Sequence, residues 1–207
     1  MRQPDTTKPT PPLWQDGWYS FARRLASPNF GPRAPGEKPE LIVIHSISLP
    51  PGVYGGGQVQ RLFTNQLDWE AHDYFRSIRG LKVSAHFFIA RDGQLWQFVS
   101  CNDRAWHAGE SSYHGKANCN DYSVGIELEG LEGHIFEPAQ YDSLSSLSAA
   151  LLQGYAISHL AGHEHIAPGR KHDPGNGFNW LLLGRSLGLA PASFPAAAAS
   201  TTDSARS

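Results

Sequence analysis

The sequence predicts a mixed β-sheet flanked by helices, in the α/β or α+β class. Three patterns indicate this class. Residues 40–45 form an almost continuous apolar run, residues 85–99 hold two apolar runs around an Asp-Gly turn, and residues 138–155 carry apolar side chains at helical spacing. Strands and helices that alternate along one chain fold as a sheet covered by helices. We expect one domain, over residues 13–188.

The first predicted strand, residues 40–45 (ELIVIH), resembles a buried central strand because only its first and last residues are polar. His45 ends the run, so its side chain would be presented at the carboxyl end of the strand. Residues 85–90 and 94–99 flank Arg91-Asp92-Gly93, and Asp-Gly between apolar runs indicates a β-hairpin. Two antiparallel strands are therefore expected there.

A further strand is predicted over residues 124–129. Side chains alternate along a strand, so its three apolar residues would face the core, whereas Glu127 and Glu129 would form a polar face. That face could be open to solvent, as one face of many antiparallel sheets is. The nearby Gly125 and Gly130 would leave room for a ligand to approach closely.

Two helices are predicted in the C-terminal part. Pro138 suits a first helical position, and a helix from there to about residue 155 would bury large side chains at helical spacing. A second helix, residues 179–187, would cover the other side of the sheet or an edge. Residues 1–12 are expected to be mobile and residues 189–207 disordered, because neither end has enough apolar surface to offset the entropy of ordering.

Composition excludes some function classes. The formal net charge is −2 and no dense basic run occurs, so nucleic acid is not an expected partner. The first twenty residues lack the apolar core of a signal peptide, and no apolar run approaches the length of a membrane span. We therefore expect a cytoplasmic protein with no membrane partner, and we also expect a monomer. Cys101 and Cys119 are expected to be reduced thiols, with a role in zinc binding as the alternative.

Histidine is frequent, with ten residues, and the densest clusters lie at residues 162–165 (GHEH) and 171–175 (KHDPG). Such clusters suggest a metal site, and catalytic zinc typically has three protein ligands. His45 is the distant candidate for the third, although it could equally be a hydrogen-bonded core histidine. Spacing does not decide between His163 and His165, and Asp173 before Pro-Gly could be an ordinary turn residue.

Five segments together resemble the AmpD family of zinc-dependent N-acetylmuramoyl-L-alanine amidases (amidase type 2). They are residues 45–52 (HSISLPPG), 83–86 (VSAH), 104–109 (RAWHAG), 119–130 (CNDYSVGIELEG) and 162–175 (GHEHIAPGRKHDPG). Their order and approximate spacing agree with the family, and the resemblance covers about residues 13–188. It implies a mixed sheet with helices and hydrolysis of the amide bond between N-acetylmuramic acid and L-alanine.

The resemblance also implies the roles of several residues. Zinc would be bound by His45, His163 and Asp173, because His163 follows the glycine of the family's Gly-His block. His165 stands where the family usually has Asp or Asn and receives no ligand role. Glu127 matches the catalytic glutamate, which would act as general base.

Lys171 matches the lysine before the aspartate ligand and would stabilise the developing oxyanion. By the same resemblance the substrate would be a small 1,6-anhydro-N-acetylmuramyl peptide released during peptidoglycan recycling. Six residues are candidates for binding it: Ser46, Tyr74, Lys82, Trp106, Asn118 and Ala167.

The sequence departs from the family pattern at positions that concern substrate rather than zinc. Ser46 replaces a usual asparagine, Lys82 replaces an arginine, and the stretch around Asn118 is less basic than in the family. Lysine is a point charge where arginine offers two parallel donors, so the affinity for peptide carboxylates could differ. His172, between Lys171 and Asp173, could compete for the metal.

Two other functions are compatible with parts of the sequence. An amidase of the cell envelope would share the zinc chemistry but would need an export signal, which the polar start of the chain does not resemble. A muropeptide-binding module without activity would lack a metal ligand or the catalytic acid. All of these residues are present here, so the sequence favours the enzyme.

Overall fold

The computed structural model describes residues 12–195 of the chain. Its centre is a six-stranded sheet with the order β12-β5-β11-β6-β7-β3. Strands β12, β5, β11 and β6 are parallel, β7 is antiparallel to β6, and β3 is parallel to β7. The predicted mixed sheet is therefore confirmed. Its strands are β3 (Arg23–Arg24), β5 (Leu41–Ile47), β6 (Phe87–Ile89), β7 (Leu95–Gln97), β11 (Ser123–Glu129) and β12 (His159–Gly162).

Short elements surround this sheet. Two-stranded antiparallel sheets are formed by β1 (Trp14–Gln15) with β2 (Trp18–Tyr19), β4 (Phe30–Pro32) with β8 (Asp103–Ala105), and β9 (Ser112–Tyr113) with β10 (Lys116–Ala117). The helices are α1 (Gln58–Phe63), α2 (Asp73–Ser77), α3 (Pro138–Gly154), α4 (His163–Ile166), α5 (Trp180–Leu187) and the 3-10 helices η1 (Cys119–Asp121) and η2 (Pro191–Ser193).

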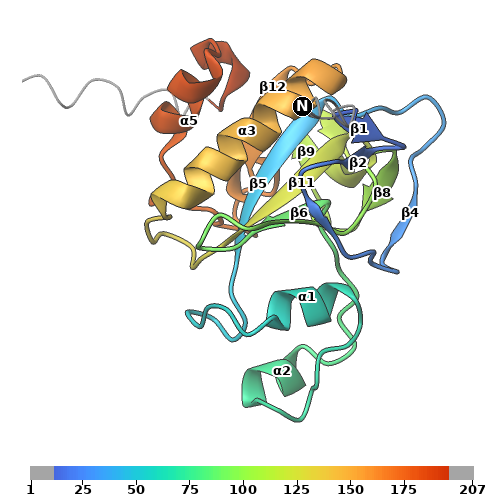
Figure 1. Cartoon of the computed structure of the whole chain (residues 1–207), viewed down its shortest axis with the longest axis vertical. Coiled ribbons are helices and arrows are strands. Elements are labelled where there is room, and N and C mark those ends of the chain that lie inside the picture. The colour runs from blue at the N-terminus through green and yellow to red at the C-terminus, as the bar shows by residue number, and fades with distance from the viewer. Residues whose placement is uncertain (1–11, 196–207) are drawn as a thin grey trace, which may run out of the picture.

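Both predicted C-terminal helices are confirmed. The long helix α3 lies across one face of the sheet with α5 beside it (Figure 1). Leu144, Leu147 and Leu151 of α3 are fully buried in the same core cluster as Leu183 of α5. The second helix therefore shares the face that α3 covers rather than covering the opposite one. Asn179 precedes α5 and accepts a hydrogen bond from the amide of Leu182, which defines where that helix begins.

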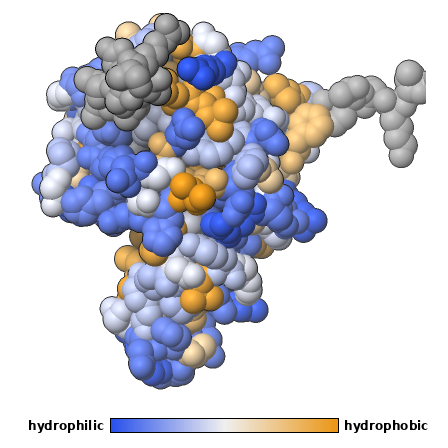
Figure 2. All heavy atoms as spheres, turned by 90° about the vertical axis from the view of Figure 1, so that its left-hand side faces the viewer, coloured by the Kyte–Doolittle hydropathy of each residue, from blue (hydrophilic) through white to orange (hydrophobic). Residues whose placement is uncertain are grey.

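The segment between β5 and β6 forms a small lobe that carries α1 and α2. It projects from the main body (Figure 1), and its surface is largely hydrophilic (Figure 2). A separate apolar cluster holds the lobe to the body: Leu62 and Phe63 of α1 and Phe75 of α2 pack with Phe88 and Phe98 from the sheet side. The lobe is therefore anchored to the sheet through a different apolar cluster from the one that contains α3.

The sequence patterns predicted where the strands lie in the chain but not which of their side chains are buried. The hairpin forms as predicted, with β6 and β7 each three residues long. Strand β11 differs from expectation, because all seven of its residues are buried, including Glu127 and Glu129. It pairs in parallel with β5 on one side and β6 on the other. Its apolar residues pack in the core cluster that contains α3, and on the other face the amides of Gly55 and Arg91 donate to the carboxylate of Glu129. The expected solvent-exposed polar face is wrong.

The predicted boundary of the C-terminal tail also needs correction. Residues 189–195 contain η2, and Phe194 packs on Trp180 with ring centroids 6.0 Å apart. The expectation of disorder from residue 189 therefore fails for this stretch, where apolar contacts with α5 order the chain. The rest of the tail, 196–207, and residues 1–11 of the predicted mobile N-terminus lie outside the described residues. Within residues 12–195, no helix is long and apolar enough to cross a membrane.

Candidate metal centre and active site

Two neighbouring parallel strands and a loop bring the candidate ligands together at the carboxyl ends of the strands. His45 lies near the carboxyl end of β5, and His163 begins α4 directly after β12, the neighbour of β5. Asp173 follows in the loop after α4, where the amide of Glu164 donates to its carbonyl oxygen at 2.9 Å. All three side chains are buried, and one ligand atom from each lies within 4.8 Å of the others. Among the described residues this is the one such group of three or more.

The geometry of the three side chains is that of a metal site. Nδ1 of His45 lies 3.0 Å from Nδ1 of His163 and 3.3 Å from Oδ2 of Asp173. Nδ1 of His163 lies 3.2 Å from Oδ1 of Asp173. Three potential electron-pair donors thus meet in a buried space, where water cannot hydrogen-bond to them in place of a metal ion.

The charge states fit a bound cation. Burial lowers the pKa of His45 to about 4, so its imidazole is neutral near pH 7. Desolvation alone would raise the pKa of Asp173, but the adjacent imidazoles of His163 and His45 hold it below its ordinary value, so the carboxylate is ionised. Two imidazoles and a carboxylate are a donor set that suits a divalent transition metal. The residues present therefore fit a metal ion.

Glu127 stands beside this group on the adjacent strand. In the parallel register of β11 and β5 it is the partner of His45. Desolvation raises its pKa well above the ordinary value, with a further contribution from the negative charge of Asp173 and an opposing one from Lys171. Its Oε2 is buried and has no hydrogen-bond partner within residues 12–195. A carboxyl oxygen without a partner at a cavity is available to a water molecule or substrate.

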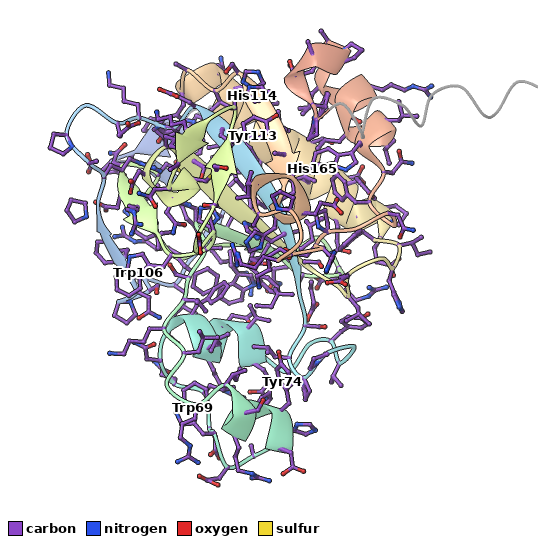
Figure 3. The ribbon with its side chains drawn as sticks, turned by 180° about the vertical axis from the view of Figure 1, so that it is seen from behind. Trp69, Tyr74, Trp106, Tyr113, His114 and His165 are labelled. Atoms are coloured by element: carbon purple, nitrogen blue, oxygen red, sulfur yellow. The ribbon has the colours of Figure 1, made fainter. Side chains whose placement is uncertain are left out.

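A cavity of about 450 Å³ opens above these residues. Glu127, His163 and Asp173 line it, together with Lys171 and three of the six candidate substrate-binding residues, Ser46, Tyr74 and Trp106. Figure 3 shows Tyr74 on the small lobe and Trp106 on the main body. The cavity is therefore formed jointly by the sheet edge, the loop after α4 and the lobe.

The other three candidates are not among the described residues that line this cavity. Lys82 is exposed in the connection from α2 to β6, and Asn118 precedes η1, with its amide bonded to the carbonyl of Ser111 at 2.9 Å. Ala167 ends α4, and its carbonyl accepts from the amides of Arg170 and Lys171 at 3.1 Å each. Ala167 thus shapes the turn that carries Lys171.

The structure places two further residues at the cavity, Arg170, to which the sequence assigned no role, and His172, which was expected only as a competing metal ligand. Nη2 of Arg170 donates to the carbonyl of Ala108 at 2.7 Å. His172, considered as a competing ligand, is outside the group that could hold the metal. Nδ1 of His165 accepts the Gly162 amide at 2.9 Å, so this ring caps the start of α4. The signal available in the sequence was that Arg170 and His172 lie in the segment 162–175, which carries two of the candidate ligands.

The space beside Gly125 and Gly130 is occupied by the protein itself. A Cβ at Gly125 would lie 2.5 Å from the ring of His107, and one at Gly130 would lie 2.5 Å from the ring of Phe136. Both glycines therefore accommodate aromatic side chains. The expected approach of a ligand is wrong at Gly125, whereas Gly130 lines the cavity. The ring of His107 also reaches His45, with Nδ1 2.9 Å from Nε2 of that ligand.

A family model described as N-acetylmuramoyl-L-alanine amidase matches residues 35–176, which include every residue of the site described above. The chain belongs to this amidase family. This confirms the resemblance found in the sequence, and with it the expectation of an enzyme.

Named relatives agree with this assignment. The chain is 48% identical over 170 residues to the 1,6-anhydro-N-acetylmuramyl-L-alanine amidase AmpD of Citrobacter freundii, an alignment that covers 81% of this chain and 91% of the relative. It is 46% identical to AmpD of Escherichia coli strain K12, with 81% and 93% covered. A crystal structure of a selenomethionine AmpD derivative superposes with a TM-score of 0.82 at 47% identity, covering 84% of this chain and 99% of that one.

A more distant amidase has been solved with a substrate. The complex of the N-acetylmuramyl-L-alanine amidase AmiD from E. coli with anhydro-N-acetylmuramic acid-L-Ala-D-gamma-Glu-L-Lys matches with a TM-score of 0.55 at 28% identity, covering 76% of this chain and 61% of that one. The fold of this chain is therefore one on which a small muropeptide binds in a relative.

Proposed function

We propose that this chain is a zinc-dependent 1,6-anhydro-N-acetylmuramyl-L-alanine amidase. It hydrolyses the amide bond between the lactyl group of 1,6-anhydro-N-acetylmuramic acid and the L-alanine of small muropeptides, in cytoplasmic peptidoglycan recycling and as a monomer. The observation that carries the proposal is the meeting of His45, His163 and Asp173 beside Glu127 at the base of one cavity. Relatives with this activity in their names, matched over nine tenths of their length, support the choice of substrate.

Zinc is the metal that this donor set suits best in a hydrolase, held by His45, His163 and Asp173. When bound, it would polarise the scissile carbonyl and make a water molecule more acidic. The protein contributes a neutral imidazole at His45 and an ionised carboxylate at Asp173, which together leave the metal its net positive charge.

Glu127 is the proposed general base. Glu127 lines the cavity and has a buried carboxyl oxygen without a partner within residues 12–195. Its raised pKa brings the carboxylate closer to the basicity that proton transfer near neutral pH requires. It takes a proton from the attacking water and delivers it to the nitrogen of the leaving L-alanine. The same side chain therefore serves both halves of the hydrolysis.

Lys171 is the proposed electrostatic partner of the reacting carbonyl. It lines the cavity beside Asp173, and its positive charge acts on Glu127. A fixed cation near the carbonyl oxygen stabilises the negative charge that develops there in the transition state. The turn at Ala167 positions the backbone from which it extends.

The remaining candidates concern substrate binding. Trp106 and Tyr74 offer aromatic surfaces for the sugar and the peptide, and Ser46 offers a hydroxyl whose buried oxygen has no partner within residues 12–195. Arg170 adds positive charge for peptide carboxylates. Lys82 and Asn118 lie outside the cavity, so contacts with them require substrate that extends beyond it.

The test is mass spectrometry of 1,6-anhydro-N-acetylmuramyl tripeptide incubated with the zinc-loaded protein, beside the Glu127→Ala variant and intact murein sacculi. Release of free tripeptide from the small substrate alone, abolished by the variant, is the expected result. Cleavage of sacculi at a comparable rate would point to an envelope amidase instead. Binding of the tripeptide without cleavage would refute the enzymatic proposal.

A further inference from the structure

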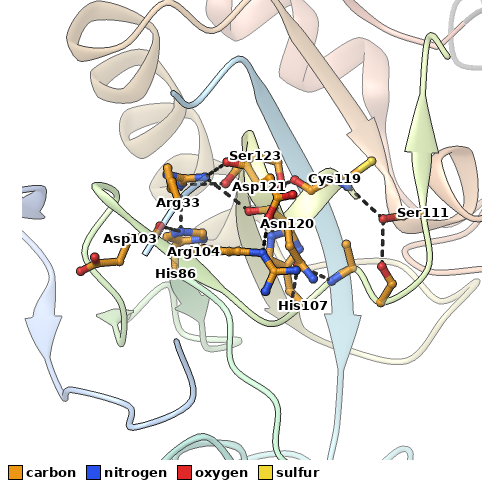
Figure 4. Close-up of polar contacts among 12 residues, drawn as sticks. Arg33, His86, Asp103, Arg104, His107, Ser111, Cys119, Asn120, Asp121 and Ser123 are labelled. Carbon is orange, nitrogen blue, oxygen red and sulfur yellow. Dashed lines mark hydrogen bonds and ion pairs between the residues drawn. The ribbon is translucent and has the colours of Figure 1, made fainter. Parts of the chain in front are cut away.

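Behind the metal ligands lies a buried chain of hydrogen bonds that the proposed mechanism does not use. It runs from Nε2 of His45 to Nδ1 of His107 at 2.9 Å, and from Nε2 of His107 to Oγ of Ser123 at 3.2 Å. Oγ of Ser123 continues to the carbonyl of Cys119 at 2.5 Å. Figure 4 shows His107, Ser123 and Cys119 within the larger polar network at this place. Each of these residues is buried.

The far end of the chain determines where the protons are. A carbonyl oxygen only accepts, so the hydroxyl of Ser123 must donate to Cys119 and its oxygen then accepts from Nε2–H of His107. A neutral His107 ring has one N–H, which leaves its Nδ1 as an acceptor. That acceptor requires Nε2 of His45 to carry its proton, and the free electron pair of His45 is then on Nδ1, the atom that faces His163 and Asp173.

The second histidine ligand is oriented by the next residue of the same segment. Nε2 of His163 lies 3.1 Å from the carbonyl of Ala108, so Nε2 carries the proton and Nδ1 is free. The amides of His107 and Ala108 both donate to Oδ1 of Asn120, at 3.0 and 2.9 Å. One side-chain oxygen therefore fixes the backbone that orients both ligands.

We infer that His107 is a positioning residue of the metal centre, which fixes His45 as an Nδ1 ligand through the chain that ends at Ser123, while the adjacent Ala108 carbonyl does the same for His163. The inference rests on metal binding in the proposed function. Gly125 is part of the device, since a side chain there would displace the ring of His107. Partners behind metal ligands commonly contribute roughly 10- to 100-fold in metal affinity.

Three variants separate positioning from simple packing. His107→Leu fills the space without an acceptor for His45, whereas His107→Asn restores an oxygen close to the position of Nδ1. His86→Leu is a stringent control. His86 is also a buried histidine, and its ring packs on that of His107 with centroids 5.8 Å apart, but it contacts Arg33, the Asp103 carbonyl and the Gly125 amide, and neither ligand. It tests what a damaged core does to the site.

The experiment measures the zinc Kd of the full chain by competition with a chelator, with the free energy of unfolding of each zinc-free variant beside it. We expect His107→Leu to weaken zinc binding roughly 10- to 100-fold, His107→Asn to recover most of the loss, and His86→Leu to lower stability with the Kd within about threefold of wild type. Equal Kd values for His107→Leu and wild type, or an equal loss in His86→Leu, would overturn the inference.

A spectroscopic measurement tests the proton positions directly. In zinc-loaded protein with ¹⁵N-labelled histidine, long-range ¹H–¹⁵N correlation spectra should show His45 and His163 with a proton on Nε2 and the metal on Nδ1. Metal on Nε2 of His45 would overturn the inference while leaving the enzyme proposal intact. Failure of the wild-type chain to bind zinc at all would instead refute the proposed function.

Discussion

The floor of the cavity is carried by three adjacent parallel strands, whereas its rim is carried by loops and by the α1–α2 lobe. On the floor, Glu127 is in register with His45, and β12 leads straight into His163. On the rim, Tyr74 lies on the five-residue helix α2. Trp106 lies in the segment that follows β8, where its amide donates to Oγ of Ser84 at 3.1 Å.

This difference shows how the molecule divides its tasks. Backbone ladders hold the floor residues, and a second layer of buried hydrogen bonds orients them, so small displacements are resisted. The rim residues are half-buried side chains on short elements, which can adjust to different peptides. Changes on the floor should therefore abolish chemistry, and changes on the rim should alter binding.

Removal of the metal should have the largest effect. Treating the loaded protein with a strong chelator is expected to abolish hydrolysis and to lower the Tm, because a ligand that binds only the folded state stabilises it. Added zinc should restore both. Asp173→Ala should resist this rescue, since it lacks the carboxylate ligand. Full activity after verified removal of the metal would show that hydrolysis does not depend on a metal at this site.

Lys171→Gln should reduce kcat by roughly 10²–10³, the usual cost of losing one group that stabilises an oxyanion. Zinc content should be unchanged, because Lys171 is not among the three ligands. Steady-state kinetics with metal analysis of the same samples check this. A rise in KM at constant kcat would contradict this role and show that Lys171 only binds substrate, as we expect of the rim residues.

Burial of the neutral His86 should make the stability of the fold depend on pH. Burial, with a contribution from the charge of Arg33, lowers the pKa of His86 to about 3. Below pH 6.5 the unfolded chain binds a proton that the folded chain does not, so the free energy of unfolding falls as pH decreases toward 3.

His86 should account for about 1.4 kcal/mol of this decrease per pH unit. Urea unfolding of the zinc-free protein between pH 7 and 5 measures the slope, and His86→Leu should make it shallower by one proton. An unchanged slope in the variant would mean that His86 is protonated in the folded state.

Trp106→Ala should have the smallest effect of the four. Loss of one aromatic contact with substrate is expected to cost about 1–1.5 kcal/mol, or roughly a tenfold rise in KM, with kcat nearly constant. Kinetics with the anhydromuramyl tripeptide check this, with Phe30→Ala as a control because that exposed aromatic is not among the described residues that line the cavity. A hundredfold loss in kcat would contradict the proposal that floor residues act in the chemistry and rim residues in substrate binding.

Sequence patterns predicted the strands and helices whose formation depends on residues close together in the chain. The strand that ends near His45, the Asp-Gly hairpin and helix α3 follow from apolar periodicity, and all three are present. Periodicity did not show that Glu127 is buried, because alternation along a strand does not reveal whether loops and the α1–α2 lobe cover its polar face.

The residues of the site that lie in family motifs could be predicted from the sequence. The residues whose role depends on tertiary contacts could not. Spacing left His163 and His165 undecided, and only the Gly-His block favoured His163, which the structure places beside His45. The role of His107 could not be found, because it depends on the approach of the segment after β8 to strands β5 and β11. Burial of Ser123 and the space over Gly125 are likewise properties of the folded chain.

The most direct test of the account is a crystal structure of the zinc-loaded protein with anomalous difference maps collected at the zinc edge. The account predicts one zinc ion per chain, bound to Nδ1 of His45, Nδ1 of His163 and the carboxylate of Asp173, with Glu127 facing it across the cavity. A peak on His172 or the cysteines, or no peak at this group in a protein shown to be active, would contradict it.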